Sequence, residues 1–269
     1  MCNRSETDIF LVGIGIFELR QMTLETRAVL RRAKKVLHLT THHAGLLAIN
    51  QNTEDLSPLY WRPDRAWDIY MAIARYVVEQ GMAFQPTAFA VNGNPMFFND
   101  ICWEIARLGK QEGLRVHALP AVSSIDVLPI QLGFDIGDLG TQIYEATELV
   151  MFALPINPHL STLILQAAEF GVSTVRCPRR TSEPFRPLVD HLLKFFPAEH
   201  PVVFLRSASA KNDPSLVLST TVGSIEACAA DIEPGMTLYV PRTHIPEVIN
   251  RLPPSADDLH TILDFSEDS

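Results

Sequence analysis

The sequence predicts an α/β protein with two α/β domains, in which short buried strands alternate with amphipathic helices. Short apolar runs recur between segments whose apolar residues have the spacing of one helix face. The run at 86–91 ends in the polar residues NGNP, 92–95, and then passes into a helical pattern, as βα units do. The length of 269 residues suits one large domain or two of ordinary size, and the 47% hydrophobic composition is that of a globular protein.

The first half contains four strand patterns and four helix patterns. Strands are expected at residues 9–14, 35–39, 86–91 and 114–120, and helices at 23–33, 65–80, 99–111 and 124–133. This alternation predicts a mostly parallel sheet whose functional loops lie at the carboxyl ends of the strands. The Asn-Gly pair at 92–93 is otherwise typical of a hairpin, but helical spacing follows it instead of a second alternating strand.

The second half is also α/β. Strands are expected at 148–155, 173–178, 201–207 and 236–241, and helices at about 158–170, 185–196 and 223–230. The Gly- and Asp-rich stretch 133–142 marks the boundary region, which reaches back to about residue 120. We place the first domain at 1–122, the second at 123–245 and an acidic C-terminal tail at 246–269.

Charge, cysteine usage and hydropathy limit the classes of function and partner that the chain can have. Asp plus Glu number 31 against 22 Lys plus Arg, and the net charge of −9 argues against binding along a nucleic-acid backbone. The four cysteines form no CxxC pair and are expected to be reduced thiols. The N-terminal segment is too polar for a signal peptide, and no apolar run approaches the roughly 18 residues that span a bilayer. We therefore expect a soluble cytoplasmic protein with no nucleic-acid or membrane partner.

Three loops that follow predicted strands are candidate ligand-binding segments: residues 11–18, 88–98 and 119–126. Glycines in the first let the backbone approach a ligand closely, and asparagines in the second offer both donors and acceptors. In the third loop, Ser123 or Ser124 is expected to cap the next helix, and the N–H groups there would equally suit a carboxylate or an adenine edge.

The motifs in these loops resemble those of the corrin/porphyrin (tetrapyrrole) methylase family. They are Gly13-Ile14-Gly15, Gly93-Asn94-Pro95-Met96-Phe97 and Pro120-Ala121-Val122-Ser123-Ser124, against the family patterns GxGxGD, GDPxxY and PGxSS. The resemblance covers roughly residues 8–245 and implies S-adenosylmethionine (SAM) bound in a cleft between two α/β domains. It places the SAM contacts at Ile16, Asn92, Gly93, Asn94, Phe97, Ser123 and Ser124, with Gln166, Ala168, Ser207 and Ala208 as the nearest equivalents in the second half.

The middle of the chain is similar to one branch of that family. Segments 59–81, 132–138, 143–152 and 156–172 resemble the borosin-type peptide-backbone N-methyltransferases. That branch uses a Tyr, Arg and Tyr set, and the resemblance places Tyr60 and Tyr70 on the two tyrosines. Ala66 stands at the arginine position, so Arg65, one residue earlier, and Arg62, four residues earlier, both stay open for that role.

Methylation of a backbone amide needs help because the amide nitrogen is a poor nucleophile. The N–H proton must leave, or the imidate must be stabilised, and a tyrosine beside a cation could serve since positive charge lowers a phenol's pKa. The alternative for Tyr70 is a core role, because Ile73, Ala74 and Val77 share its helix face. Tyr60 could also line a peptide groove together with its neighbour Trp61.

The resulting prediction is a SAM-dependent methyltransferase acting on a separate ribosomal precursor peptide. Enzymes of the resembling family are usually homodimers, which implies a homodimer here. The peptide is expected to be separate since the tail, ending in DFSEDS, has no Val- or Ile-rich segment. No metal is expected: His38, His42 and His43 lack the spacing of a zinc site. Two rival readings stay open. One is a tetrapyrrole or other small-molecule methylase. The other is an inactive binding module of the same fold, favoured by Ala66, by Asn92 at the position of a further family tyrosine, and by the altered first loop.

Overall fold

The computed structural model describes residues 7–172, 174–175 and 185–243. The first half contains the strands β1 (Ile9–Gly13), β2 (Lys35–Leu39), β3 (Thr53–Asp55), β4 (Thr87–Val91) and β5 (Val116–Ala118). Its helices are α1 (Leu24–Arg32), α2 (His43–Ile49), α3 (Ser57–Tyr60), α4 (Ala66–Ala83) and α5 (Asp100–Gln111). The strands form one sheet in the order β3-β2-β4-β1-β5, and all its pairings are parallel.

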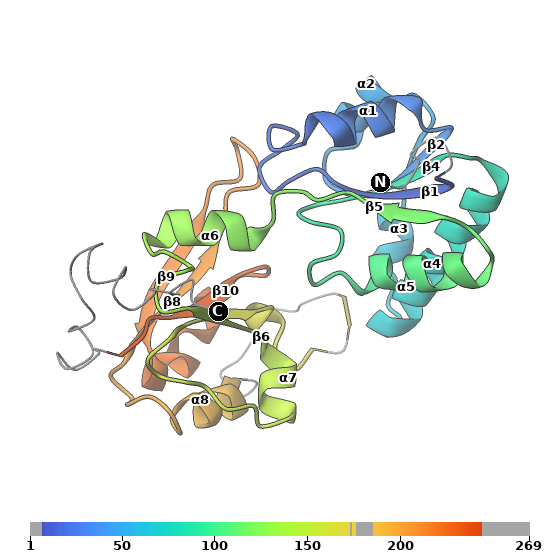
Figure 1. Cartoon of the computed structure of the whole chain (residues 1–269). Coiled ribbons are helices and arrows are strands. Elements are labelled where there is room, and N and C mark those ends of the chain that lie inside the picture. Colours follow the sequence, from blue (N-terminus) through green and yellow to red (C-terminus); the bar gives the residue numbers. More distant parts are fainter. Residues whose placement is uncertain (1–6, 173, 176–184, 244–269) are drawn as a thin grey trace, which may run out of the picture.

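Helices cover both faces of this first sheet. Along β1, Ile9 and Leu11 belong to the cluster built with α4 and α5, while Phe10 and Val12 belong to the cluster built with α1 and α2. Figure 1 shows these two helix pairs on opposite sides of the sheet. Because the inner strands β1 and β4 are buried on both faces, their residues are mostly apolar in succession instead of alternating.

The second half forms a separate, mixed sheet. It contains β6 (Thr141–Glu145), β7 (Ser161–Leu165), β8 (Pro201–Arg206), β9 (Leu216–Thr221) and β10 (Thr237–Val240), in the order β6-β7-β10-β8-β9. Its helices are α6 (Ser124–Leu132), α7 (Ala146–Met151) and α8 (Arg186–Leu192), with 3-10 turns at Ala167–Glu169, Val222–Ser224 and Glu226–Asp231. Only β6 and β7 pair in parallel, and the other neighbours are antiparallel.

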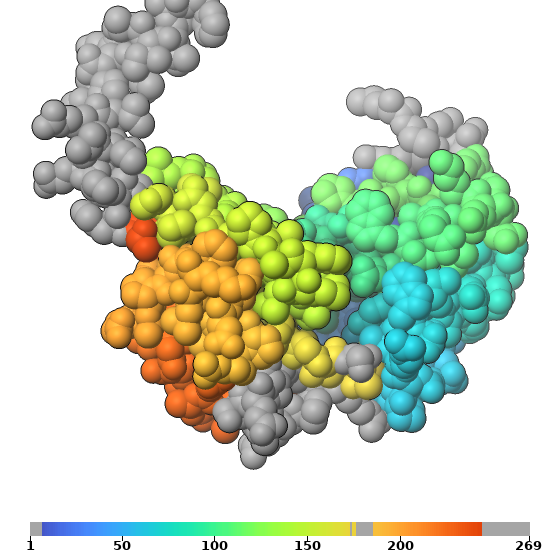
Figure 2. Space-filling view, turned by 90° about the horizontal axis from the view of Figure 1, so that it is seen from below, coloured from blue at the N-terminus to red at the C-terminus, as the bar shows by residue number. Residues whose placement is uncertain are grey.

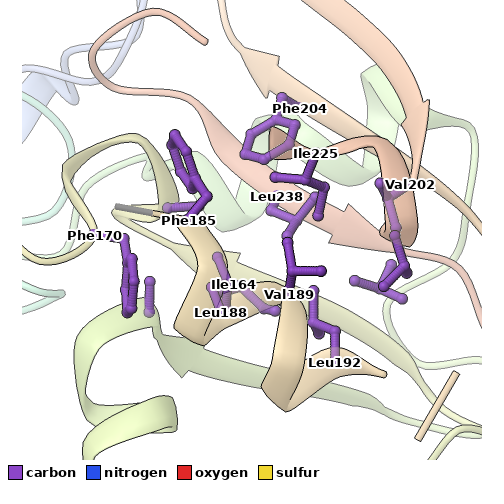
Figure 3. Packing of buried hydrophobic residues seen from close by; sticks show 14 of the residues in the cluster. Ile164, Phe170, Phe185, Leu188, Val189, Leu192, Val202, Phe204, Ile225 and Leu238 are labelled. Carbon is purple, nitrogen blue, oxygen red and sulfur yellow. The ribbon is translucent and has the colours of Figure 1, made fainter. Parts of the chain in front are cut away.

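The core of the second half lies between this sheet and α8. Leu188 and Leu192 of α8 belong to the same buried cluster as Ile164 and Leu238 of the sheet. Figure 3 shows these side chains packed together, with Phe185 at the start of the helix. The two sheets form two lobes in Figure 1, each with its own core.

The structure confirms the predicted fold class and the strand and helix order of the first half. Segments α2, β3 and α3, between residues 43 and 60, were not predicted. The predicted domain limit at 122/123 falls just before α6 and stays a prediction. The tail at 246–269 and most of the expected strand 173–178 lie outside the described residues. Within the described part of the chain, no helix combines the length and apolarity that crossing a membrane requires.

Two predicted elements of the second half are wrong. The first half of the segment 148–155, expected as a strand, belongs to α7, and the helix expected at 158–170 is β7 followed by a 3-10 turn. Helix α7 is capped by Glu145, whose carboxylate accepts the N–H of Glu148 at 2.6 Å, and glutamate is not among the usual capping residues. Strand β7 is buried on both faces, and such short apolar runs have no period that separates strand from helix.

Candidate functional site

The three predicted ligand loops meet at Gly13, the last residue of β1. A Cβ atom on Gly13 would lie 1.9 Å from the carbonyl oxygen of Gly93 and 2.5 Å from the Cβ of Ala121. The N–H of Gly93 also donates to the oxygen of Gly15 at 2.8 Å, and Gly15 has a φ of +87°. Only glycine at position 13 lets the loops approach this closely, so one function of these glycines is to assemble the site.

Side chains within the loops fix their backbone. The amide oxygen of Gln21 accepts the N–H groups of Ile16 at 2.8 Å and Phe17 at 2.9 Å. In the third loop, the N–H and the hydroxyl of Ser123 donate to the same oxygen of Asp126 at 2.7 and 3.0 Å. Ser123 is therefore the residue that caps α6, and Ser124 is the first residue of that helix.

The second loop divides its two asparagines between two roles. Asn94 accepts the N–H of Met96 at 2.9 Å and so holds the turn, whereas Asn92 lies at the edge of a cavity. Gly93, between them, is buried. Phe97 packs edge-on against Phe98, with 4.9 Å between ring centroids. The loop thus connects the junction at Gly13 to the cavity.

That cavity has a volume of about 640 Å³. It is lined by Leu39, Thr40, Thr41, His43, Asp55, Ser57, Tyr60, Trp61, Tyr70, Val91, Asn92, Phe98, Asn99, Asp100, Ile101 and Gln166. Most of these residues follow β2, β3 or β4, because the carboxyl ends of parallel strands meet at one edge of a sheet. Figure 2 shows the surface hollowed between the two halves of the chain, on the side where cyan and yellow residues face each other.

The two candidate tyrosines lie together in this cavity. Tyr60 ends α3 and Tyr70 lies near the start of α4, and their rings are stacked with centroids 6.2 Å apart and planes inclined by 15°. Trp61 packs edge-on against Tyr60 at 5.1 Å. The sequence therefore correctly indicated that positions 60 and 70 come together.

The electrostatic surroundings of the pair differ from the expectation. Burial raises the pKa of Tyr60, and its contact with Tyr70 acts in the same direction. Burial also raises the pKa of Tyr70, outweighing a hydrogen bond with Tyr60 that lowers it. The carboxylates of Glu169 and Asp100 favour the neutral phenol as well. Both side chains are phenols at neutral pH, and the expected lowering of the pKa by a cation is not found.

The candidate arginines lie outside the cavity lining. Arg65 is the N-cap residue of α4, and its backbone forms an isolated bridge with Thr174. Arg62 lies in the exposed turn before it. Ala66, at the position expected for the arginine, is the first residue of α4. The structure thus brings the tyrosines together without either arginine.

Two lining residues have an unusual backbone conformation. Phe98 has a φ of 48° and Gln166 a φ of 53°, in the left-handed region that a side chain with a Cβ rarely adopts. Each conformation costs about 1–2 kcal/mol, and such residues cluster at functional sites. Gln166 follows β7, so its conformation brings a side chain of the second half to a cavity formed by the first.

The other candidates from the second half lie beside this site. Ala168 is buried in the 3-10 turn after β7. Ser207 donates its hydroxyl to Gln131 at 2.6 Å, and Ala208 follows it in the loop after β8. This loop contacts the first loop, because the N–H of Glu18 donates to the carbonyl oxygen of Ser209 at 2.8 Å. None of the three candidates lines the cavity.

Several lining residues were not predicted, among them His43, Asp55, Phe98 and Asp100. The signal that could have found His43 is positional. The predicted strand 35–39 neighbours the strand 86–91 in the sheet, so the residues that follow the two strands lie at one edge. His43 had instead been considered only as a zinc ligand, and no group of three or more His, Cys, Asp or Glu in the described part of the chain could hold a metal ion.

The charge of the cavity lining is acidic. Asp55 and Asp100 line it, and no Lys or Arg is found among its described lining residues. Burial raises the pKa of Asp100, assisted by the nearby carboxylates of Glu104 and Glu145. Together with the rings of Tyr60 and Tyr70, this lining suits a cationic or neutral ligand better than an anion.

Comparison with known proteins adds a family match and curated relatives. The model of the Tetrapyrrole (Corrin/Porphyrin) Methylases matches residues 8–226. The methyltransferase/ribosomally synthesized cyclic peptide lentinulin A precursor of Lentinula edodes is 26% identical over 218 residues, 80% of this chain and 52% of that protein. The corresponding omphalotin A precursor of Omphalotus olearius is 26% identical over 236 residues, 86% and 57% of the two chains. The chain spans about half the length of these relatives.

Solved structures show the same fold. Uroporphyrin-III-C-methyltransferase from Thermus thermophilus superposes with a TM-score of 0.62 at 20% identity, covering 87% of this chain and 91% of that one. The enzyme from the same organism complexed with S-adenosyl homocysteine gives a TM-score of 0.59 at 17% identity, with 90% and 92% covered. These likenesses extend over both lobes of the molecule.

Proposed function

Because the chain belongs to the tetrapyrrole (corrin/porphyrin) methylase family, we propose that it is a SAM-dependent methyltransferase acting on backbone amides of a ribosomal precursor peptide. The observation that carries this proposal is the stacked pair Tyr60 and Tyr70 inside a 640 Å³ cavity that is lined in part by Asn92 and Phe98 of the second family loop. The curated relatives, which are named as methyltransferase/precursor peptide proteins, support the peptide as substrate.

The residues present fit SAM. Its sulfonium is a cation, and the acidic, aromatic lining with Asp100 and Tyr70 offers favourable contacts to such a group. Asn92 and Gln166 present amides at the same cavity, and Gly93, next to Asn92 in the chain, lies at the junction with Gly13. These residues, with Ile16, Gly93, Asn94, Phe97, Ser123, Ser124, Ala168, Ser207 and Ala208 around them, are the proposed cofactor contacts.

SAM, when bound, supplies an electrophilic methyl group: the N–C bond forms as the C–S bond breaks, and that electron pair stays on sulfur. The protein's task is to align the amide nitrogen, exclude water and remove the amide proton. We assign the last role to the Tyr60 and Tyr70 pair, which would accept the proton on one hydroxyl and release one from the other to solvent. Because the phenols are neutral, they act as a relay and do not start as phenolates.

The acidic lining bears on the rival substrate class. Tetrapyrrole precursors carry several carboxylates, and a cavity with Asp55 and Asp100 and no lining cation among the described residues would repel them. The lining aromatic residues Trp61 and Phe98 instead suit the apolar side chains of a peptide. This favours the peptide proposal over the tetrapyrrole one.

Two further parts of the proposal concern partners. The peptide is proposed to be a separate chain, although the curated relatives are named as methyltransferase and precursor in one protein. Intact mass measurement of the purified protein and of the added peptide shows which of the two gains 14-Da increments. A homodimer remains part of the proposal.

The test is mass spectrometry of candidate precursor peptides incubated with the protein and SAM. We expect Tyr60→Phe and Tyr70→Phe to lower the methylation rate about 10²-fold, the range of general acid–base contributions. Tyr76→Phe is the matched control, because Tyr76 lies on the same helix but bonds to Glu54 at 2.7 Å outside the cavity. Full activity of both cavity variants would remove the tyrosines from the mechanism, and no methylation by the wild type would reject the function.

A further inference from the structure

A buried histidine behind the cavity has no role in the chemistry described so far. His38, in β2, is fully buried, and its Nε2 lies 2.8 Å from Nδ1 of His43. His43 begins α2 and lines the cavity. A buried imidazole bonded to one nitrogen of a cavity imidazole is in position to decide which nitrogen of the second ring carries the proton.

A backbone hydrogen bond determines which imidazole donates in the His38–His43 hydrogen bond. The N–H of Thr40 donates to Nδ1 of His38 at 3.2 Å, so this nitrogen is the acceptor and the proton of a neutral His38 lies on Nε2. That proton is donated to Nδ1 of His43. His43 in its neutral form therefore carries its own proton on Nε2, which has no hydrogen-bond partner among the described residues.

The charges around the pair keep His38 neutral. Asp55 is the facing carboxylate, but its oxygen is 3.9 Å from Nδ1 of His38, beyond hydrogen-bond distance, and it accepts the N–H of Ser57 instead. Burial lowers the pKa of His38, and this effect outweighs the attraction of Asp55; the neighbouring His43 adds to the lowering. The direction of the hydrogen bonds is thus maintained at neutral pH.

We propose that His43 donates a hydrogen bond from Nε2 to the carbonyl oxygen of the acceptor amide, and that His38 is the positioning residue that holds His43 in this tautomer. The inference rests on the proposed peptide methylation. When the amide proton leaves, negative charge develops on that oxygen, and a fixed donor in a closed site stabilises it. The proton of His43 stays on Nε2 while the amide proton passes to the tyrosine pair. In this structure the exposed Arg62 and Arg65 do not occupy that position.

The first experiment measures tautomers in the wild-type protein and does not depend on activity. Histidine ¹⁵N chemical shifts of the labelled protein at neutral pH should show both His38 and His43 protonated on Nε2. A proton on Nδ1 of His43, or a doubly protonated His38, would overturn the proposal. In His38→Leu the His43 signal should become a mixture of tautomers, since the bonded donor is lost.

The second experiment measures methylation kinetics. We expect His43→Ala to lower kcat about 10²-fold with little change in KM, and His43→Gln, which keeps an N–H donor near the Nε2 position, to regain part of the rate. His42→Ala is the matched control, because His42 is adjacent in sequence but does not line the cavity. If the wild type is active and His43→Ala is equally active, the proposed role of His43 is overturned while the proposed function stands. A wild type that methylates no peptide overturns the proposed function, and with it this inference.

Discussion

At the scale of single residues, Gly13 controls how the three loops assemble. Gly13→Ala would place a methyl group against the carbonyl oxygen of Gly93 and the side chain of Ala121, at 1.9 and 2.5 Å. Because backbone cannot move aside without displacing a strand end, we expect a loss of about 1–3 kcal/mol in the free energy of unfolding. Urea denaturation measures this loss.

The control is Gly137→Ala, in the exposed loop before β6, where the nearest atom to a new Cβ is a side-chain oxygen at 3.3 Å. That variant should unfold within about 0.5 kcal/mol of the wild type. If both variants have equal stability, the loops do not need glycine at position 13.

At the scale of elements, hydrogen bonds from Arg115 to Asp8 link the start of β5 to the start of β1. Its carboxylate accepts the N–H of Arg115 at 2.8 Å and its guanidinium at 3.0 and 3.1 Å. These bonds hold the pKa of Asp8 below its usual range. A lowered pKa in the folded state means that the stabilisation is complete above the unfolded pKa of about 4 and disappears as the pH falls through the folded value.

We therefore expect Asp8→Asn to lower the free energy of unfolding by about 1 kcal/mol at pH 7, a modest value because Arg115 is half exposed. The difference from the wild type should shrink as the pH falls from about 4 through the lowered pKa of folded Asp8, which denaturation over a pH series shows. The exposed Asp231→Asn is the control. A difference that persists unchanged at low pH would show that the charge of Asp8 is not its source.

The elements also show what the sequence could predict. The parallel strands such as β1 were predictable because apolar runs alternate with periodic helices, and the ends of α4 and α5 followed from their spacing. In the site, Tyr60, Tyr70 and Asn92 were predicted to share one place, whereas His43 was not, since α2 is too short to give a periodic signal. The exposure of Arg65 depends on the turn before α4, whose direction no local pattern fixes.

At the scale of the whole molecule, the two lobes meet through the first loop and the loop after β8. The N–H of Glu18 donates to Ser209 at 2.8 Å, and its carboxylate lies 3.4 Å from the N–H of Lys211. A ligand bound between the lobes adds its free energy to the folded state. S-adenosylhomocysteine at 100 times its Kd stabilises by about 2.7 kcal/mol, which for a protein of this size shifts Tm by on the order of 5–10 °C.

Differential scanning fluorimetry with S-adenosylhomocysteine tests this expectation, with adenosine and homocysteine added separately as controls. A Tm that does not change at millimolar concentration of the full compound would mean that the protein does not bind this class of ligand. It would then favour the rival reading of a fold that is kept without its methyl donor.

The two lobes contribute unequally to the lining of the cavity, and Gln166 comes from the second lobe. It is the one residue after position 101 among the described lining residues, and its left-handed backbone directs it there from the end of β7. The sequence of the second half could therefore change with little effect on which peptide is accepted, provided that the side-chain amide of Gln166 kept its position. Selectivity for one peptide over another would be inherited with the N-terminal lobe.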